Sequence, residues 1–332
     1  MAPKDSLLNI TDPSLRQPPP GQTRSYPSPS STGKVPFDIP KHSTRSETWY
    51  ALFGKLDSSS IPLIALHGGP GCGHNYLKTL SLLSTGPYAR PVILYDQIGC
   101  GHSTRFRDRR QDDSFWQPQL FIDELNNLIS HLKITQFDLL GQSWGGMLGA
   151  QYASLQPKGL RKLVICDSPT DMKTWVAVAN QMRALLPKEV QETLTRCEEK
   201  GETSSEEYEH AVLEFYKLFV CRVQPFPSEF NETMDNLKDD DTVYFSMNGP
   251  SEFHVIGNLK TWDIRPELHK ITVPTLLING KYDEAQDVTM APFFHGIKSG
   301  VKWIRFAESS HMPHLEETED FVVAVGGFLD SD

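Results

Sequence analysis

The sequence predicts an α/β fold, in which helices flank a mainly parallel β-sheet and a helical segment is inserted between two of the strands. Three observations predict this fold. Short apolar runs bounded by Gly or Pro alternate with segments of helical periodicity along the 332-residue chain. Glycine-rich turns follow directly behind some of the apolar runs. One long stretch between two later strands has helical character throughout.

The first 34 residues are expected to form an extension outside this fold. Residues 11–34 are rich in Pro, Ser, Gly and Thr and have little apolar surface to bury. The extension, residues 1–34, should therefore be flexible or lie over the surface. We expect ordered structure to begin near Val35, with an early strand in the segment TWYALFG at 48–54.

Residues 35–169 are expected to form the first part of the core. Four apolar runs predict strands buried on both faces of a sheet: IPLIAL (61–66), PVILYDQ (91–97), FDLLGQS (137–143) and LRKLVICDSP (160–169). Two helices are predicted between these strands. Phe121, Leu125, Leu128, Ile129 and Leu132 fall on one helical face, and the segment GGMLGAQYASLQP ends a second helix at Pro157.

The long helical stretch at 170–265 is predicted to be an inserted cap. It contains several aromatic residues and charged segments such as CEEKGETSSEEYEHAV (197–212), and we expect it to cover the core rather than to form an independent domain. The second part of the core follows over 266–332. There, VPTLLING (273–280) and VKWIRFAES (301–309) predict the last two strands.

Composition and charge exclude several classes of protein. A net charge of −10 without a basic stripe argues against binding of nucleic acid or of anionic membranes. Five cysteines without CxxC spacing predict neither a disulfide framework nor a zinc site. The N-terminal MAPKDSLLNI lacks the apolar stretch of a signal peptide, and no apolar run approaches membrane length. We therefore expect a cytoplasmic protein; its oligomeric state is unknown from the sequence.

A GxSxG motif, Gly141-Gln142-Ser143-Trp144-Gly145, lies between a predicted strand and a predicted helix. Glycines on both sides of a serine permit the tight, strained turn that raises its hydroxyl above the sheet. The motif alone is weak, because five-residue patterns arise by chance and a serine in such a turn can simply cap the helix. Its position between strand and helix makes Ser143 the predicted nucleophile.

A nucleophilic serine needs a base, and the base needs an acid that fixes its tautomer. Asp283 and His311 each follow an expected strand, in the chain order serine, acid, histidine. Loops at these positions gather at the carboxyl edge of a parallel sheet, so Asp283 and His311 are the predicted acid and base. Glu284 and Asp287 are alternatives for the acid. His314 is an alternative for the base, although we expect it at the surface or behind the site.

The segment HGGPG at 67–71 follows a buried strand. Three of its five residues are glycines, which have no side chain. Attack by a serine creates an oxyanion that backbone N–H groups must stabilise. One donor is the amide of Trp144, the residue after the nucleophile, and the other is expected from Gly68 or Gly69. The glycines leave these amides uncovered, so that they can face a substrate carbonyl. A plain tight turn is the alternative interpretation of the same segment, and it explains less.

Several of these segments resemble the proline iminopeptidases, which are α/β-hydrolase serine aminopeptidases of the prolyl aminopeptidase and tricorn-interacting-factor type. The resemblance lies in the Asp283 and His311 placement and in HGGPG (67–71), DQIGCGHS (96–103), GQSWGG (141–146) and MNGPSEF (247–253). It extends from about Val35 to the C-terminus. It implies an α/β-hydrolase fold with a cap, a metal-independent mechanism without cofactors, and a triad of Ser143, Asp283 and His311.

The resemblance also implies a substrate class. Family members release an unblocked N-terminal residue, often proline, from short peptides, and they hold its amine with glutamates of the cap. One of these glutamates matches Glu252 in MNGPSEF. A second acid is usual in the family, but this chain has Gln224 where relatives often carry it. Glu207 and Glu214 are nearby alternatives for that acid.

Three other functions compete with the aminopeptidase. An amidase or esterase that acts on small amino-acid derivatives or a secondary metabolite would use the same triad. A hydrolase of epoxides or halides would need a carboxylate at position 143, where this chain has serine. A non-catalytic receptor on this fold should have lost a member of the triad, whereas this chain retains all three. The expected partner is a short peptide or an amino-acid amide.

Overall fold

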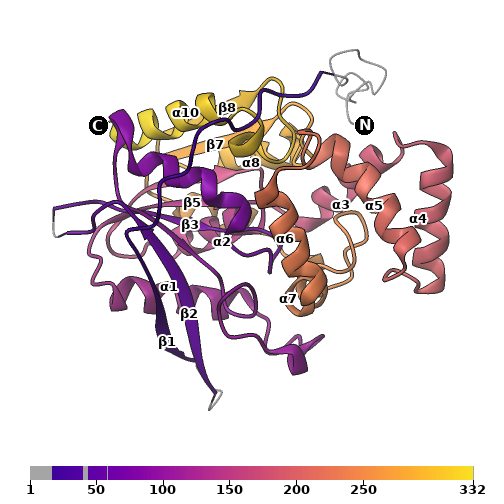
Figure 1. The fold of residues 1–332 in the computed structure, drawn as a ribbon, viewed down its shortest axis with the longest axis horizontal. Coiled ribbons are helices and arrows are strands. Elements are labelled where there is room, and N and C mark those ends of the chain that lie inside the picture. Colours follow the sequence, from indigo (N-terminus) through magenta and orange to yellow (C-terminus); the bar gives the residue numbers. More distant parts are fainter. Residues whose placement is uncertain (1–16, 40–43, 58, 332) are drawn as a thin grey trace.

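The computed structural model describes residues 17–39, 44–57 and 59–331 (Figure 1). These residues form an eight-stranded sheet in the order β1-β2-β4-β3-β5-β6-β7-β8. The first two strands pair antiparallel with each other, β2 pairs antiparallel with β4, and every other neighbouring pair is parallel. The strands are β1 (Ser31–Asp38), β2 (Arg45–Phe53), β3 (Leu63–Leu66), β4 (Val92–Tyr95), β5 (Phe137–Gln142), β6 (Leu160–Cys166), β7 (Thr275–Gly280) and β8 (Val301–Phe306).

The sheet has a core layer on each face, which confirms the predicted α/β fold. Along β3, Ile64 and Leu66 pack in one layer and Leu63 and Ala65 pack in the other, as the alternation of side chains in a strand requires. One layer includes residues of α1 (Pro118–His131), α2 (Trp144–Ser154) and α8 (Asp287–Gly296). The other includes residues of η3 (Asn75–Ser84) and α10 (Thr318–Asp330).

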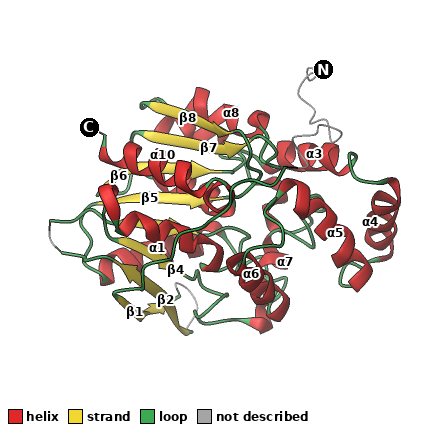
Figure 2. Cartoon of the chain, turned by 45° about the horizontal axis from the view of Figure 1, so that its top comes forward, coloured by secondary structure: helices red, strands yellow, loops and turns green. Residues whose placement is uncertain are grey.

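A long helical segment separates β6 from β7. Its helices are α3 (Met172–Arg183), α4 (Lys188–Lys200), α5 (Glu206–Phe219), α6 (Ser228–Asp239) and α7 (Thr242–Met247), and the 3-10 turns η6 (Asn258–Thr261) and η7 (Arg265–Lys270) follow. Asp171 and Asp263 form a bridge, so the two ends of the segment lie side by side. Figure 2 shows α3 to α7 gathered on one side of the sheet, with α4 and α5 extending farthest from it.

The start of the fold differs from the expectation. Strand β1 begins at Ser31, four residues before Val35, because Ser31 is in register with Leu52 of β2. Backbone pairing therefore orders a segment whose own composition favours disorder. The described residues before it lie against the core: the Gly21 amide donates to the Glu316 carbonyl at 2.8 Å. Residues 1–16 of the extension lie outside the described part of the chain.

Short elements complete the chain: η4 (Gly86–Tyr88), η5 (Arg107–Arg109) and α9 (Pro313–Glu316). Among the described helices, none combines the length and the apolar character that crossing a membrane requires.

Candidate active site

The predicted nucleophile lies in a strained turn between β5 and α2. Ser143 has φ 56° and ψ −123°, a conformation that non-glycine residues rarely adopt. The next loop along the sheet holds it there: the Ser143 amide donates to the Cys166 carbonyl at 2.9 Å, and the Ser168 hydroxyl donates to the Ser143 carbonyl at 2.8 Å. A Cβ at Gly145 would overlap the Leu66 carbonyl. Glycine is therefore required for the turn to pack against β3.

The predicted base and acid are paired. His311 follows β8 and Asp283 follows β7, and both side chains are buried. His311 Nδ1 lies 2.6 Å from Asp283 Oδ1, which also accepts a hydrogen bond from the Ala285 amide at 2.7 Å. His311 and Ser143 line the same cavity of about 50 Å³. The structure therefore brings Ser143, Asp283 and His311 together at the carboxyl edge of the sheet.

The alternatives for the base and the acid lie elsewhere or face other groups. Asp287 pairs with Arg305 at the surface. His314 is buried, its ring packs against that of Tyr76, and burial lowers its pKa to about 3. Glu284 lies near the opposite nitrogen of the base, with its Oε1 3.8 Å from His311 Nε2. The geometry thus favours Asp283 as the carboxylate that orients His311.

The two candidate donors of the HGGPG loop, the amides of Gly68 and Gly69, differ in their surroundings. The Gly68 N–H donates to the Tyr76 hydroxyl at 2.6 Å, and that hydroxyl donates to Gln142 Oε1 at 2.7 Å. Gly69 lines the cavity beside Ser143. The engaged amide of Gly68 makes Gly69, together with Trp144, the better pair of donors for an oxyanion.

Gln97 ties this loop to the turn that carries the nucleophile. Its side chain accepts from Trp144 Nε1 at 2.9 Å and donates to the His67 carbonyl at 2.9 Å, while its own amide donates to His67 Nε2. Burial lowers the pKa of His67 to about 4, so its ring is neutral and donates through Nδ1 to the Gly68 carbonyl. The two segments that bear the amides of Gly69 and Trp144 are therefore held in fixed relation.

Two glutamates line the same cavity. Glu252 lies on the loop after α7 and accepts from the Tyr244 hydroxyl at 2.7 Å, and Glu284 is buried next to Asp283. Burial raises the pKa of Glu252. Burial, and then the charges of Glu252 and Asp283, raise the pKa of Glu284 well above its usual range. A cationic group that enters this cavity can pair with both carboxyls, because its charge favours the ionisation that burial opposes.

The residues considered for the second acid are engaged elsewhere. Glu207 pairs with Arg196 and Glu214 with Lys217, and the Gln224 side chain donates to the Cys221 carbonyl. The sequence predicts Glu284 only as an alternative to Asp283. Its position directly after Asp283 could have indicated a role in the site, because neighbouring residues in a loop at the sheet edge can both face the site.

One further acid was missed by the sequence analysis. Asp167 follows β6, has a positive φ of 53° and is fully buried, and its amide donates to the Ile278 carbonyl of β7 at 2.7 Å. Its carboxyl lies close enough to Asp283 for that group, after burial, to raise its pKa. Within the described residues, neither oxygen of Asp167 nor Oδ2 of Asp283 has a hydrogen-bond partner.

A proton shared by these two carboxyls would satisfy one oxygen of Asp167 and Oδ2 of Asp283. Burial, and then the neighbouring Asp283, raise the pKa of Asp167 well above its usual range. Asp167 is therefore the member of the pair that we expect to hold a proton and to donate it in a hydrogen bond to Asp283. We therefore expect Asp167 to position Asp283.

We expect Asp167→Ala to lower kcat about 10- to 100-fold, since leaving a buried carboxylate oxygen unpaired costs about 1–3 kcal/mol. Asp167→Asn should stay within about threefold of wild type, because its amide can still donate to Asp283. Steady-state kinetics of the two variants measure this difference. Equal loss in both would contradict a hydrogen bond that the amide can replace.

The same variant predicts a change in how stability depends on pH. The pKa of Asp167 is raised on folding, so the native state holds a proton that the unfolded chain releases. The wild type therefore loses stability as pH rises above the unfolded pKa, whereas Asp167→Asn has no such proton to lose. Melting temperatures at pH 5 and pH 8 should show the variant gaining on wild type at the higher pH. A constant difference would contradict a neutral Asp167.

Comparison with known proteins places the chain in one family. Residues 61–318 match the sequence model of a protein family described as the alpha/beta hydrolase fold. A proline iminopeptidase of Heyndrickxia coagulans is 37% identical over 281 residues, which are 84% of this chain and 94% of that protein. A proline iminopeptidase of Saccharolobus solfataricus is 35% identical over 286 residues, which are 85% of this chain and 88% of that protein.

Two solved structures are similar over nearly their whole length. The crystal structure of VinJ superposes with a TM-score of 0.85 at 44% identity and covers 91% of this chain and 99% of VinJ. The crystal structure of a proline iminopeptidase from Mycobacterium smegmatis superposes with a TM-score of 0.80 at 42% identity and covers 90% of this chain and 97% of that one.

Proposed function

The chain belongs to the proline iminopeptidase family of α/β hydrolases, and we propose that it is a serine aminopeptidase that releases an unblocked N-terminal residue, preferably proline, from short peptides. One observation carries the proposal. Glu252 and Glu284 line the same cavity as Ser143 and His311, so a free amine can be held next to the carbonyl under attack. The charge of an ammonium group would favour ionisation of both carboxyls, which burial opposes when the cavity is empty.

The reaction follows from the positions of these groups. Ser143 Oγ attacks the carbonyl carbon of the first residue, and its proton passes to His311 Nε2 while Asp283 holds Nδ1. The amides of Gly69 and Trp144 donate to the oxyanion. His311 then gives the proton to the leaving nitrogen as the C–N bond breaks, which leaves an acyl ester on Ser143. Water, deprotonated by His311, hydrolyses that ester and releases the amino acid.

The preference for proline is supported by a second, narrow pocket beside Ser143. Trp144, Met147 and Trp175 form an apolar part of its lining, and Glu252 also lines it. Its volume is only about 10 Å³, so it must widen before it can hold a proline ring; the apolar ring would then face the tryptophans while the cationic nitrogen reaches Glu252.

We also propose the division of the chain and its location. Residues 170–265 act as a cap over the core formed by 35–169 and 266–332, because the cap contributes Glu252 to the cavity while the core contributes Ser143 and His311. A cytoplasmic location agrees with all five cysteines being free, since proteins of reducing compartments rarely form disulfides. No cofactor is required for the proposed reaction.

The test compares a free prolyl arylamide with its N-acetylated form. We expect acetylation to lower kcat/KM at least about 100-fold, because it removes the charge that the two glutamates bind. A panel of other aminoacyl arylamides measures the preference for proline. A similar kcat/KM on the free and the acetylated substrate would contradict the proposal.

An amidase or esterase for small amino-acid derivatives is the alternative. The observation that favours it is the small volume of the cavity around Ser143, about 50 Å³, which suits a small substrate better than a peptide. Turnover of prolyl esters and amides without turnover of prolyl peptides would favour this alternative.

A further inference from the structure

A buried carboxylate braces the loop that carries the base. Glu316 is fully buried and accepts four hydrogen bonds. Its Oε2 accepts from the amides of Ser310 and Met312, at 2.7 and 3.2 Å. Its Oε1 accepts from the Ser310 hydroxyl at 2.8 Å and from the Arg222 amide at 2.6 Å. The residues on both sides of His311 are therefore attached to one side chain.

The local backbone explains how Glu316 reaches these amides. Pro313 begins the short helix α9, which follows the base directly. Proline suits the first position of a helix, because its fixed φ is helical and its missing N–H would have no partner there. The Glu316 amide donates back to the Met312 carbonyl at 2.9 Å. This tight turn returns the Glu316 side chain to the loop from which α9 starts.

Two further contacts fix the same loop. The side chain of Gln142, the residue before the nucleophile, donates to the His311 carbonyl at 2.9 Å. That carbonyl and the Met312 amide, which Glu316 binds, belong to one peptide group, so the group is held at both ends. A Cβ at Gly280 would overlap the carbonyl of the residue before His311, so the loop packs directly on the end of β7. The backbone around the base is therefore fixed by contacts that do not involve the imidazole.

The fourth donor to Glu316 connects the base to the cap. Arg222, whose amide donates to Glu316, lies shortly after the end of α5. Its guanidinium lies 4.1 Å from the centre of the Tyr282 ring, and Tyr282 directly precedes the acid of the triad. Next to that acid, the Glu284 amide donates at 3.4 Å to the carbonyl of Phe219, the last residue of α5. The end of α5 therefore meets the loop of the acid and the loop of the base.

The donors around Glu316 suit an ionised carboxylate, which accepts hydrogen bonds and donates none. Burial raises the pKa of Glu316 to about 7, and the hydrogen bonds from Arg222 and Ser310 act against that rise. Above this pH the side chain is charged, and hydrogen bonds to a charged group are stronger than those between neutral groups. A neutral side chain of the same size should therefore hold the loop less firmly.

We propose that Glu316 is a positioning residue for His311: its carboxylate holds the backbone on both sides of the base and joins it to the end of the cap helix α5. Its hydrogen bonds go to backbone amides and a serine hydroxyl, so its effect on catalysis passes through the placement of the imidazole next to Ser143. The inference rests on the proposed function only in taking His311 as the base that activates Ser143.

The first test measures turnover and binding separately. Glu316→Gln keeps the size of the side chain, but its NH2 group must face at least one backbone amide that also donates. We expect kcat for a free prolyl arylamide to fall about tenfold at pH 8, and about 100-fold in Glu316→Ala, since a misplacement of about 1 Å can cost about 100-fold. In the Ser143→Ala background, calorimetry should show the dissociation constant of prolinamide changing less than about twofold, because the base acts in the transition state.

A second readout depends on the base but not on an amine in the substrate. Diethyl 4-nitrophenyl phosphate forms a bond between Ser143 Oγ and phosphorus and releases 4-nitrophenolate, while the serine proton passes to His311. The rate of release therefore reports on the base whatever the natural substrate is. We expect this rate to fall in Glu316→Gln by about the same factor as kcat. Should Glu316→Ala not fold, Glu316→Gln decides the question.

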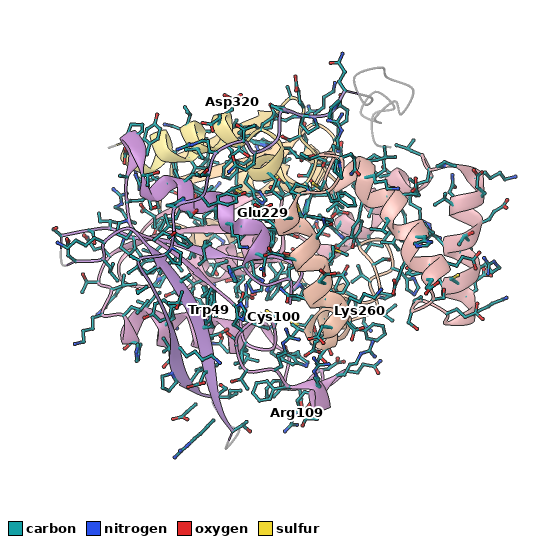
Figure 3. The ribbon with its side chains drawn as sticks, viewed as in Figure 1. Trp49, Cys100, Arg109, Glu229, Lys260 and Asp320 are labelled. Atoms are coloured by element: carbon teal, nitrogen blue, oxygen red, sulfur yellow. The ribbon has the colours of Figure 1, made fainter. Side chains whose placement is uncertain are left out.

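The matched control is Glu319→Gln, which should leave both rates at the wild-type level. Glu319 is exposed on α10 and lies 3.4 Å from Arg24, and Figure 3 shows its neighbour Asp320 at the edge of the molecule. Unchanged rates in Glu316→Gln would overturn the inference, as would a loss that appears in the prolinamide dissociation constant instead of the rates. The phosphate reagent decides on Glu316 even if the prolyl arylamide is not a substrate, so failure of the proposed function is distinguishable from failure of this inference.

Discussion

Ser143→Ala is expected to lower kcat for a free prolyl arylamide by at least about 10⁴-fold, since removing the nucleophile of such a site costs as much as removing its partners together. The strained turn around residue 143 is held by backbone contacts to the neighbouring loop, which alanine keeps. Binding of substrate should therefore change little, and the loss should appear in kcat rather than in the dissociation constant. Single-turnover kinetics and calorimetry on the same preparation measure the two quantities.

The matched control is Ser130→Ala, at an exposed position near the end of α1. It should retain wild-type kcat. Residual turnover above about 1% in Ser143→Ala would point to another nucleophile. Cys72 lines the same cavity, but burial raises the pKa of its thiol well above the usual range. A neutral thiol is a poor nucleophile, so we expect it not to replace the serine.

The sequence predicted what depends on local pattern. The strand before Ser143 and the helix after it are marked by an apolar run and by small residues, and the structure has β5 and α2 there. Asp283 and His311 were found by the same reasoning, because each follows a strand of a parallel sheet and such loops gather at one edge. The structure has both side chains at that edge, paired with each other.

What the sequence could not predict depends on contacts between distant segments. The sequence does not distinguish Gly68 from Gly69; in the structure the Tyr76 hydroxyl, from η3, engages the amide of Gly68, whereas Gly69 lines the cavity. The buried pair of Asp167 and Asp283 joins the loops after β6 and β7, and no spacing along the chain marks it. Strand β1 likewise owes its start at Ser31 to pairing with β2 rather than to its own composition.

The combined change Glu252→Gln and Glu284→Gln is expected to lower kcat/KM for a free prolyl arylamide about 1000-fold, and each single change about 10- to 100-fold. The glutamine side chain keeps the size of glutamate but cannot offer a charge, and hydrogen bonds to charged groups contribute about 1.5–3 kcal/mol each. The acetylated substrate carries no positive charge at its N-terminus, so its kcat/KM should change little between wild type and these variants. Kinetics on the paired substrates measure both effects, and Glu214→Gln, which breaks a surface pair with Lys217, is the control.

The pH dependence separates a charge effect from a change of shape. The pKa of both carboxyls is raised, so in the empty enzyme they are protonated at low pH and ionise as pH rises. An ammonium group is bound by the ionised forms. For wild type, kcat/KM on the free substrate should therefore rise with pH through the range in which these carboxyls ionise, relative to the acetylated substrate. The double variant has no carboxyl to ionise at these positions, so this relative rise should disappear. If it persisted, the amine would be held by groups other than Glu252 and Glu284, and the preference for a free N-terminus would need a different origin.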